Sequence, residues 1–399
     1  MSKEESPLSV MMVAGEASAD LHGSELVKEL NKRGCHETYG VGGSAMRALG
    51  FQAHYPAEAI SVAGLTEVVF ALPRLIRMLR GLVELAVERQ PDLIVLIDLP
   101  DFNLRLAKRL KRRGFKVVYY ISPQLWAWRK KRVELIRRYV DRMLVILPFE
   151  EAFYREHKVS VDFVGHPLVE EVQDVMSPSE ARSHFELQPD AKVLALLPGS
   201  RRKEVERLLP TMLETFQRLR ATHPHLVGLI PIASTLQEAW LRDQAPAELL
   251  KGVEFIREQA PEVVRAADAA IVCSGTSTLQ TALLATPMVI VYRVSWLTFA
   301  ILRRLVKVAH IGLVNLIAGR RLVPEFVQDE CSPSKIVDAV SPLLEKSPER
   351  EAMLQGFKEL KQTLGEPGVS ERVTDILFQE CARLPAATEP NTLPRDTAP

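Results

Sequence analysis

Carboxylates that directly follow a short apolar segment are the most suggestive chemical groups in this chain. The apolar run Leu93–Ile97 ends at Asp98, and Asp101 and Asn103 come just beyond it. A carboxylate at a strand end can accept a proton when its neighbours hold it near a substrate hydroxyl. Asp98 is therefore the first candidate for a general base. Asp101 could equally cap the helix that we expect to begin near Asn103.

A second polar loop, residues 15–22, follows the apolar run Val10–Ala14 and contains Glu16, Ser18 and Asp20. A loop that opens into a helix can bind an anion or a sugar hydroxyl through free backbone N–H groups. Ser18 or Asp20 could instead cap the helix, whereas Glu16 precedes the cap and is the second candidate for catalysis. The loop lacks G-x-G-x-x-G spacing, which argues against a nicotinamide or flavin cofactor.

Two loops further along the chain suit a diphosphate. The first follows the apolar run 193–197 and carries an arginine, whose planar guanidinium matches phosphate oxygens. The second follows the run 269–273, where small residues open a helix with N–H groups free for phosphate. A glutamine one turn later could meet a ribose hydroxyl. The predicted nucleotide-diphosphate site consists of Arg201, Ser274, Gly275, Thr276 and Gln280.

Short apolar runs alternate with helical patterns throughout, which predicts parallel, doubly wound α/β sheets. Strands are expected at 10–14, 38–41, 93–97, 117–121, 142–147, 161–164, 193–197, 228–231, 253–256, 269–273 and 288–292. The pattern stops after 165–167 and restarts at 193, so we expect two Rossmann-like halves with a ligand-binding cleft between them. Ligands of such sheets bind beyond the carboxyl ends of the strands.

The 399 residues are too many for one ordinary core. We expect a Rossmann-like domain at 1–168, a linker region at 169–190 and a second Rossmann-like domain at 191–345. C-terminal helices at 346–383 would pack back on the first domain. The tail 384–399 has four prolines and no apolar periodicity, so we expect it to be disordered.

Composition narrows the classes of function. A formal net charge of +1 argues against a dedicated nucleic-acid binder, although fourteen Lys or Arg residues lie between positions 105 and 142. That basic face suits phosphate groups, an anionic membrane or simply solvent. Four cysteines without paired spacing favour reduced thiols in the cytoplasm over a metal site.

Lipid contact is suggested by two segments, 65–86 and 296–308, which combine apolar residues at helical spacing with interleaved arginine or lysine. Either could be ordinary core packing. Together they indicate an acylated substrate or work at a membrane surface.

Eight short segments between Val13 and about Glu330 stand out as motifs, and SPQLWAWR is the most specific of them. They are VAGEASAD, IDLPDFN, YYISPQLWAWRKKRV, LPFEEAFY, VGHPL, LLPGSR, SGTSTLQ and NLIAGR. In these segments and in their order, the chain resembles the lipid-A-disaccharide synthase family.

The resemblance implies an inverting, metal-independent glycosyltransferase of the two-Rossmann GT-B type that needs no cofactor. The family joins UDP-2,3-diacylglucosamine to 2,3-diacylglucosamine 1-phosphate, called lipid X, and releases UDP. It implies a peripheral protein on the inner face of the inner membrane, with UDP in the C-terminal domain. Family members can form homodimers that swap C-terminal elements, so Asn315, assigned to UDP, could serve the partner's site.

On the acceptor side, the resemblance places Glu16 and Asp98 in catalysis. The acceptor-side residues are then Ser18, Asp20, Asp101, Asn103, Ser122, Trp126, Trp128 and His166. A lone histidine is more often structural than a base, so His166 is not the expected base. Two departures stand out: Gln280 replaces the family's Glu, and Ala19 replaces its Gly.

Two other functions fit the same sequence. A UDP-N-acetylglucosamine 2-epimerase can share the double-Rossmann plan, but the lipophilic segments and SPQLWAWR count against it. A peripheral module that binds nucleotide-lipids without turnover is favoured only by Gln280.

Overall fold

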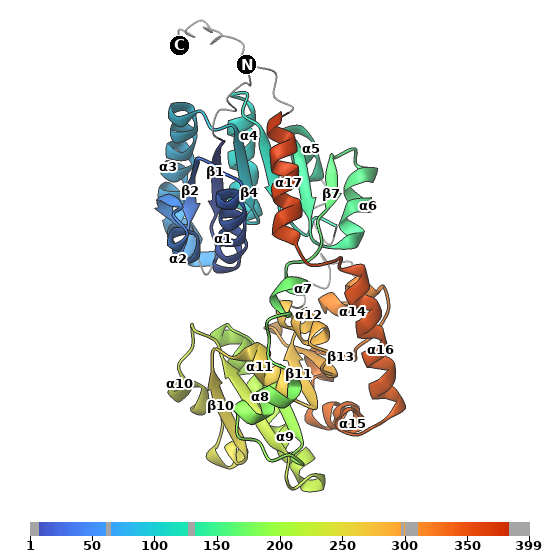
Figure 1. Cartoon of the computed structure of the whole chain (residues 1–399). Coiled ribbons are helices and arrows are strands. Elements are labelled where there is room, and N and C mark those ends of the chain that lie inside the picture. Colours follow the sequence, from blue (N-terminus) through green and yellow to red (C-terminus); the bar gives the residue numbers. More distant parts are fainter. Residues whose placement is uncertain (1–7, 61–64, 127–131, 297–298, 300–309, 383–399) are drawn as a thin grey trace, which may run out of the picture.

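The computed structural model describes residues 8–60, 65–126, 132–296, 299 and 310–382. The chain forms two lobes, each built on a twisted parallel sheet with helices packed against it (Figure 1). The C-terminal helix returns to the first lobe, so two connections run between the lobes. Trp128 and the tail beyond residue 382 lie outside the described residues.

The first lobe contains a seven-stranded sheet in the order β3-β2-β1-β4-β5-β6-β7. Every pairing in it is parallel, as the helices between successive strands require. The strands are β1 (Ser9–Ala14), β2 (Glu37–Gly42), β3 (Gln52–Pro56), β4 (Leu93–Ile97), β5 (Val117–Tyr120), β6 (Arg142–Val145) and β7 (Val161–Phe163). The central strands β1, β4 and β5 are buried almost throughout, which explains their continuous apolar sequences.

Helices cover both faces of this sheet. On one face, Leu82, Leu106, Ile136 and Tyr154 belong to one buried cluster. Their helices are α3 (Leu65–Arg89), α4 (Pro100–Lys111), α5 (Val133–Tyr139) and α6 (Pro148–Glu156). The other face is covered by α1 (Ala17–Lys32), α2 (Ser44–Ala48) and the C-terminal helix α17 (Val369–Ala382). Within the described segments, no helix combines the length and apolar content that crossing a bilayer requires.

The second lobe contains a six-stranded parallel sheet in the order β10-β9-β8-β11-β12-β13. The strands are β8 (Val193–Leu197), β9 (Val227–Ile232), β10 (Val253–Arg257), β11 (Ala269–Cys273), β12 (Met288–Tyr292) and β13 (Glu325–Val327). One continuous apolar cluster joins them to the surrounding helices. These helices are α7 (Leu168–Glu171), α8 (Pro178–His184), α9 (Arg202–Thr222), α10 (Glu238–Arg242), α11 (Ala260–Ala266), α12 (Thr276–Leu283), α14 (Leu313–Ala318), α15 (Pro333–Leu344) and α16 (Pro348–Thr363).

The two connections between the lobes lie side by side. The His166 N–H donates to the Leu364 carbonyl (2.9 Å), and Gly165 and Gly365 approach closely with positive φ. The Arg372 guanidinium, on α17, donates to the carbonyl of Val164 in the first connection. It also donates to the carbonyls of residues 366 and 367 in the second. One arginine therefore fastens both connections to the first lobe.

The C-terminal helices divide between the lobes. α16 packs on α12, α14 and α15 of the second lobe, whereas α17 packs on α1 and β4 of the first. The segment 169–190 contains α7 and α8 instead of a bare linker, and α8 packs on α11. Its Ala181 is fully buried in the second core. The Ser177 hydroxyl accepts from the Glu180 N–H and the Glu180 carboxylate from the Ser177 N–H, which starts α8.

Two edge strands, β3 and β13, were absent from the sequence-based expectation. β3 alternates exposed and partly buried residues and has no apolar run, and β13 has only three residues. Edge strands bury less surface, so their apolar signal is weak. β5 also ends one residue early, because Ile121 adopts a positive φ of 63°.

We predict that Leu377→Ala in α17 destabilises the first lobe by about 2–4 kcal/mol, because the side chain is fully buried and leaves a cavity. Chemical denaturation followed by circular dichroism measures the loss. Gln379→Ala, at an exposed position of the same helix, is the matched control. Equal stability of the two variants would contradict the packing of α17 described above.

Candidate active site

The turn from β4 to α4 holds Asp98 in an uncommon backbone conformation. Asp98 and Leu99 have φ values of 49° and 50°, in the left-handed region that non-glycine residues seldom adopt. The Asn103 side-chain amide donates to the carbonyls of Ile97 (3.1 Å) and Asp98 (2.8 Å). The buried Tyr119 hydroxyl also donates to the Asp98 carbonyl. Asn103 and Tyr119 therefore fix the turn, and Asn103 acts on Asp98 through its backbone.

Glu16 lies near Asp98, because β1 and β4 are neighbours and Ala14 pairs with Ile97. Gly15 lets the two turns approach, since a Cβ there would lie 2.5 Å from Leu99 Cδ2. Burial and the negative charge of Glu16 raise the pKa of Asp98 to about 6, against a smaller opposing effect of the Leu99 N–H. A carboxylate with such a pKa is a competent proton acceptor near neutral pH.

Three expected acceptor-side residues have structural partners. Asp20 accepts from the backbone N–H groups of Gly43 (2.6 Å), Ala45 (2.9 Å) and Met46 (3.3 Å), so it caps α2 and not its own helix. Asp101 lies in the first turn of α4 and forms an ion pair with Arg132 (2.7 Å). His166 is buried, and its Nδ1 accepts from the Leu168 N–H (3.2 Å). Burial, followed by the charge of His22, lowers the pKa of His166 to about 3.

Ser18 is exposed in the first turn of α1. Ser122 and Trp126 belong to the loop that follows β5, the strand next to β4. Both donate to one oxygen of Glu150, a buried carboxylate in the first turn of α6 (2.7 and 3.1 Å). Burial raises the pKa of Glu150 to about 7, opposed by these hydrogen bonds. Sequence analysis missed Glu150, although it stands inside the matching segment LPFEEAFY.

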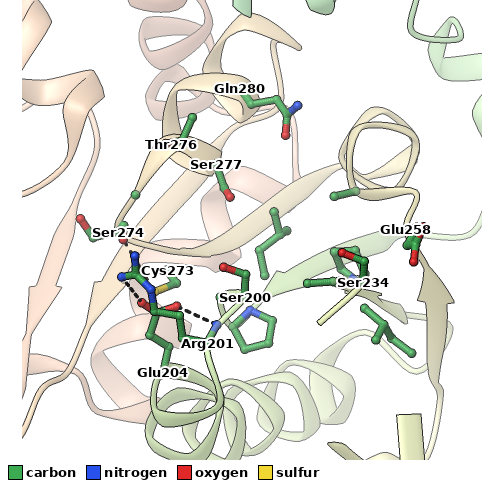
Figure 2. Close-up of a pocket in the computed structure, with 18 of the residues that line it drawn as sticks. Ser200, Arg201, Glu204, Ser234, Glu258, Cys273, Ser274, Thr276, Ser277 and Gln280 are labelled. Carbon is green, nitrogen blue, oxygen red and sulfur yellow. Dashed lines mark hydrogen bonds and ion pairs between the residues drawn. The ribbon is translucent and has the colours of Figure 1, made fainter. Parts of the chain in front are cut away.

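A cavity of about 620 Å³ opens at the carboxyl ends of β8, β9, β10 and β11 in the second lobe (Figure 2). It is lined by all five residues of the predicted nucleotide-diphosphate site: Arg201, Ser274, Gly275, Thr276 and Gln280. It also contains Ser234 and Glu258, which follow β9 and β10 and which sequence analysis missed. Both strands had been expected, so the carboxyl-edge rule applied to their loops would have found these two residues.

The cavity offers groups that suit an anion. The Arg201 side chain is 84% exposed, and its one ion pair with another described residue is to Glu204 at 3.3 Å, so it can reorient toward a ligand. Gly275 precedes α12 without a side-chain cap, which leaves the first N–H groups of this helix available. A Cβ at Gly275 would meet nothing within 4 Å. The site can therefore hold a diphosphate with backbone and arginine donors.

Asn315 does not line this cavity. Its amide nitrogen donates to the Val323 carbonyl and to Glu325, both at 2.8 Å, and its oxygen accepts from the Val323 N–H. Glu325 also accepts from the Ile311 N–H (3.1 Å), and the Ile311 carbonyl accepts from the Ser274 hydroxyl (3.0 Å). Asn315 is thus connected to the cavity only through other residues of its own chain.

Two parallel α/β lobes, with a cavity at the carboxyl edge of the second sheet, are the architecture of GT-B glycosyltransferases. The chain is similar to the crystal structure of the kitacinnamycin glycosyltransferase, with TM-score 0.65 and 17% identity over 94% of this chain and 99% of that one. It is also similar to the UDP-GlcNAc 2-epimerase from Neisseria meningitidis, with TM-score 0.64 and 12% identity over 93% and 100%. These similarities show the fold alone.

Sequence comparison identifies the family. The lipid-A-disaccharide synthetase family model matches residues 10–373. A lipid-A-disaccharide synthase from Anaeromyxobacter sp. (strain K) is 48% identical over 92% of this chain and 96% of its own length. The chain belongs to the lipid-A-disaccharide synthase family and is a glycosyltransferase of lipid A biosynthesis.

We predict that Asp98→Asn is more stable than the wild-type protein above pH 6, by on the order of 1–2 kcal/mol for this partly exposed group. A raised pKa means that the native carboxyl holds its proton more tightly than the unfolded one. The contribution of Asp98 to wild-type stability therefore falls as pH rises from its usual pKa of 3.8 to about 6. Asparagine does not ionise, so the variant does not lose this stability, and asparagine tolerates a positive φ.

Thermal melting between pH 4 and pH 8 tests this prediction. The difference between variant and wild type should grow from pH 4 to pH 6 and stay constant above. Asp101→Asn, whose side chain is 70% exposed, serves as control. A pH-independent difference would refute the assignment of the raised pKa to Asp98.

Proposed function

We propose that the chain transfers 2,3-diacylglucosamine from UDP-2,3-diacylglucosamine to the 6-hydroxyl of lipid X, with inversion, giving the β-1,6 lipid A disaccharide 1-phosphate and UDP. The observation that carries the proposal is the half-buried Asp98, whose pKa is raised to about 6 on the edge of the first sheet. Family membership and the anion-binding cavity of the second lobe support it.

The proposed reaction is a single displacement. Asp98 accepts the proton of the acceptor's 6-hydroxyl as its oxygen forms a bond to the anomeric carbon of the donor. The bond between that carbon and the diphosphate breaks on the opposite face, and its electron pair leaves with UDP. Burial, together with the negative charge of Glu16, keeps the pKa of Asp98 high enough for proton transfer. An ordinary aspartate would be a weaker base at neutral pH.

As the bond breaks, negative charge develops on the diphosphate, which the proposal places in the cavity of the second lobe. Arg201 and the N–H groups at the start of α12 stabilise it electrostatically as the bond breaks. Gln280 offers a neutral partner to a ribose hydroxyl, in a weaker bond than the family's Glu would form. Ser274 holds its loop through the Ile311 carbonyl.

The lipid substrates place this chemistry at the inner face of the inner membrane, where the chain would bind peripherally from the cytoplasm. The amphipathic helix α3, with Leu72 exposed near its start, and the 79% exposed Trp296 support contact with acyl chains. We also propose a homodimer with exchanged C-terminal elements. Within one chain Asn315 lies outside the UDP cavity, and the exchange would offer it a route to the partner's site.

We predict that the purified chain forms the disaccharide from the two lipid substrates, detected by mass spectrometry, and that Asp98→Asn lowers kcat by at least about a hundredfold through loss of the base. In the wild-type protein, kcat/KM should rise with pH around an inflection near pH 6. Glu16→Gln removes a charge that raises this pKa, so the inflection should move to lower pH. Near-normal turnover by Asp98→Asn would exclude this base, and absence of product from wild type would exclude the proposed function.

We predict that Arg201→Ala weakens UDP binding about tenfold or more, because a charge-assisted hydrogen bond to phosphate is lost. Isothermal titration with UDP measures the change. Arg202→Ala is the matched control, since that guanidinium lies over the Trp240 ring and does not line the cavity. Equal losses in the two variants would indicate a general effect of basic charge and contradict the assignment.

A further inference from the structure

Glu150 is a buried carboxylate with no part in the chemistry described so far. It is 1% exposed and lies in the first turn of α6, directly after β6. One oxygen accepts from the Ser122 hydroxyl (2.7 Å) and the Trp126 indole N–H (3.1 Å). The other accepts from the Leu147 N–H (3.3 Å). Among the described residues, no cation forms an ion pair with it.

Stability alone gives little reason to keep such a group. A buried carboxylate without a cation loses its hydration, and an apolar side chain of similar size is often at least as stable in such a position. Capping of α6 accounts for the bond to Leu147. It does not account for the two donors from the loop after β5. Those two bonds fix the position of this loop and restrict its motion.

α6 holds the same loop at other points. The Tyr154 hydroxyl, one turn after Glu150, donates to the Pro123 carbonyl (3.4 Å). The Phe149 ring meets the Trp126 ring edge to face, with centroids 4.9 Å apart and planes at 89°. The Trp126 indole is thus held by Glu150 at its N–H and by the Phe149 ring, yet it is only partly buried. An indole held in this way can offer a rigid apolar face to a ligand.

The loop is adjacent to the proposed base. Strands β4 and β5 are neighbours, and the Asp98 N–H donates to the Tyr120 carbonyl (3.0 Å). The Tyr119 hydroxyl donates to the Asp98 carbonyl. Burial raises the pKa of Tyr119, and the nearby charges of Asp98 and Tyr154 raise it further. Tyr119 therefore bonds the backbone of the proposed base and lies near Tyr154 of α6. A sugar presented to Asp98 would come within reach of the loop after β5.

We infer that Glu150 is a positioning residue for the acceptor: by holding Ser122 and Trp126 it presents the indole ring to the acceptor sugar beside Asp98. This inference rests on the proposed function, because it requires an acceptor at Asp98. Glu150 itself touches neither substrate. Its effect is therefore on acceptor binding and orientation, and UDP binding in the other lobe is independent of it.

The test is a comparison of the two Michaelis constants in Glu150→Ala. The acceptor KM should rise about tenfold, because only part of the free energy of the two lost hydrogen bonds passes to acceptor binding, and the donor KM should stay within about twofold. Glu150→Gln should restore most of the acceptor affinity, because its amide oxygen still accepts from Ser122 and Trp126. Glu151→Ala is the matched control, since Glu151 pairs with Arg155 on the surface of the same helix.

Trp126→Phe keeps the aromatic ring and removes the N–H donor, so it decides the question if Glu150→Ala does not fold. It should raise the acceptor KM in the same direction. In the double variant with Glu150→Ala, the acceptor KM should be no higher than in the more severe single variant, because both single variants already lose the Trp126–Glu150 hydrogen bond. Equal increases in both Michaelis constants, or unchanged constants in the presence of a lower kcat, would overturn the inference.

A wild-type protein that makes no disaccharide would refute the proposed function instead. Calorimetric titration with lipid X separates the two failures. Weaker lipid X binding by Glu150→Ala, with unchanged UDP binding, supports the inference without relying on turnover. Unchanged lipid X binding overturns it.

Discussion

The rest of the first lobe's chemistry depends on how the chain leaves β4. Asp98 and Leu99 occupy the left-handed region in succession, a conformation that costs roughly 1–3 kcal/mol for each residue outside glycine. It persists because the side chains of Asn103 and Tyr119 both donate to the Asp98 carbonyl. A regular turn would give up those bonds and would aim the carboxylate elsewhere. The same constraint explains Gly15, since Leu99 occupies the space of a side chain there.

The second lobe reaches its chemistry with less strain at the anion-binding residues. Arg201 is an exposed side chain, and the start of α12 supplies backbone N–H groups as a consequence of helix geometry. This difference fits the roles proposed for the two lobes. A base needs a raised pKa, and therefore burial and a neighbouring charge. A diphosphate already carries its charge, so donors that remain open to solvent can meet it.

The carboxyl-edge rule explains which parts of the site could be predicted from the sequence. Apolar runs mark the buried central strands, and the residues that follow them include Asp98, Arg201 and Gln280. Sequence alone could not reveal partners from distant segments. Glu150 bonds Trp126 from 24 positions further along the chain, and Asp20 caps α2 from the preceding helix. A carboxylate that serves as a cap and one that serves as a base look alike in sequence, because only burial and the surrounding donors separate them.

Asn315 is a second residue whose role cannot be read from the sequence. Family resemblance assigns it to UDP, yet every polar atom of its amide is engaged within its own chain. Its influence on the cavity passes through Glu325, which holds the backbone of Ile311, whose carbonyl in turn fixes the Ser274 hydroxyl. Removing the Asn315 amide would leave the buried N–H and carbonyl of Val323 without their partner and would take one donor from Glu325. Loss of donor affinity in such a variant would therefore not by itself demonstrate contact with UDP, because displacement of the Ser274 loop produces the same result.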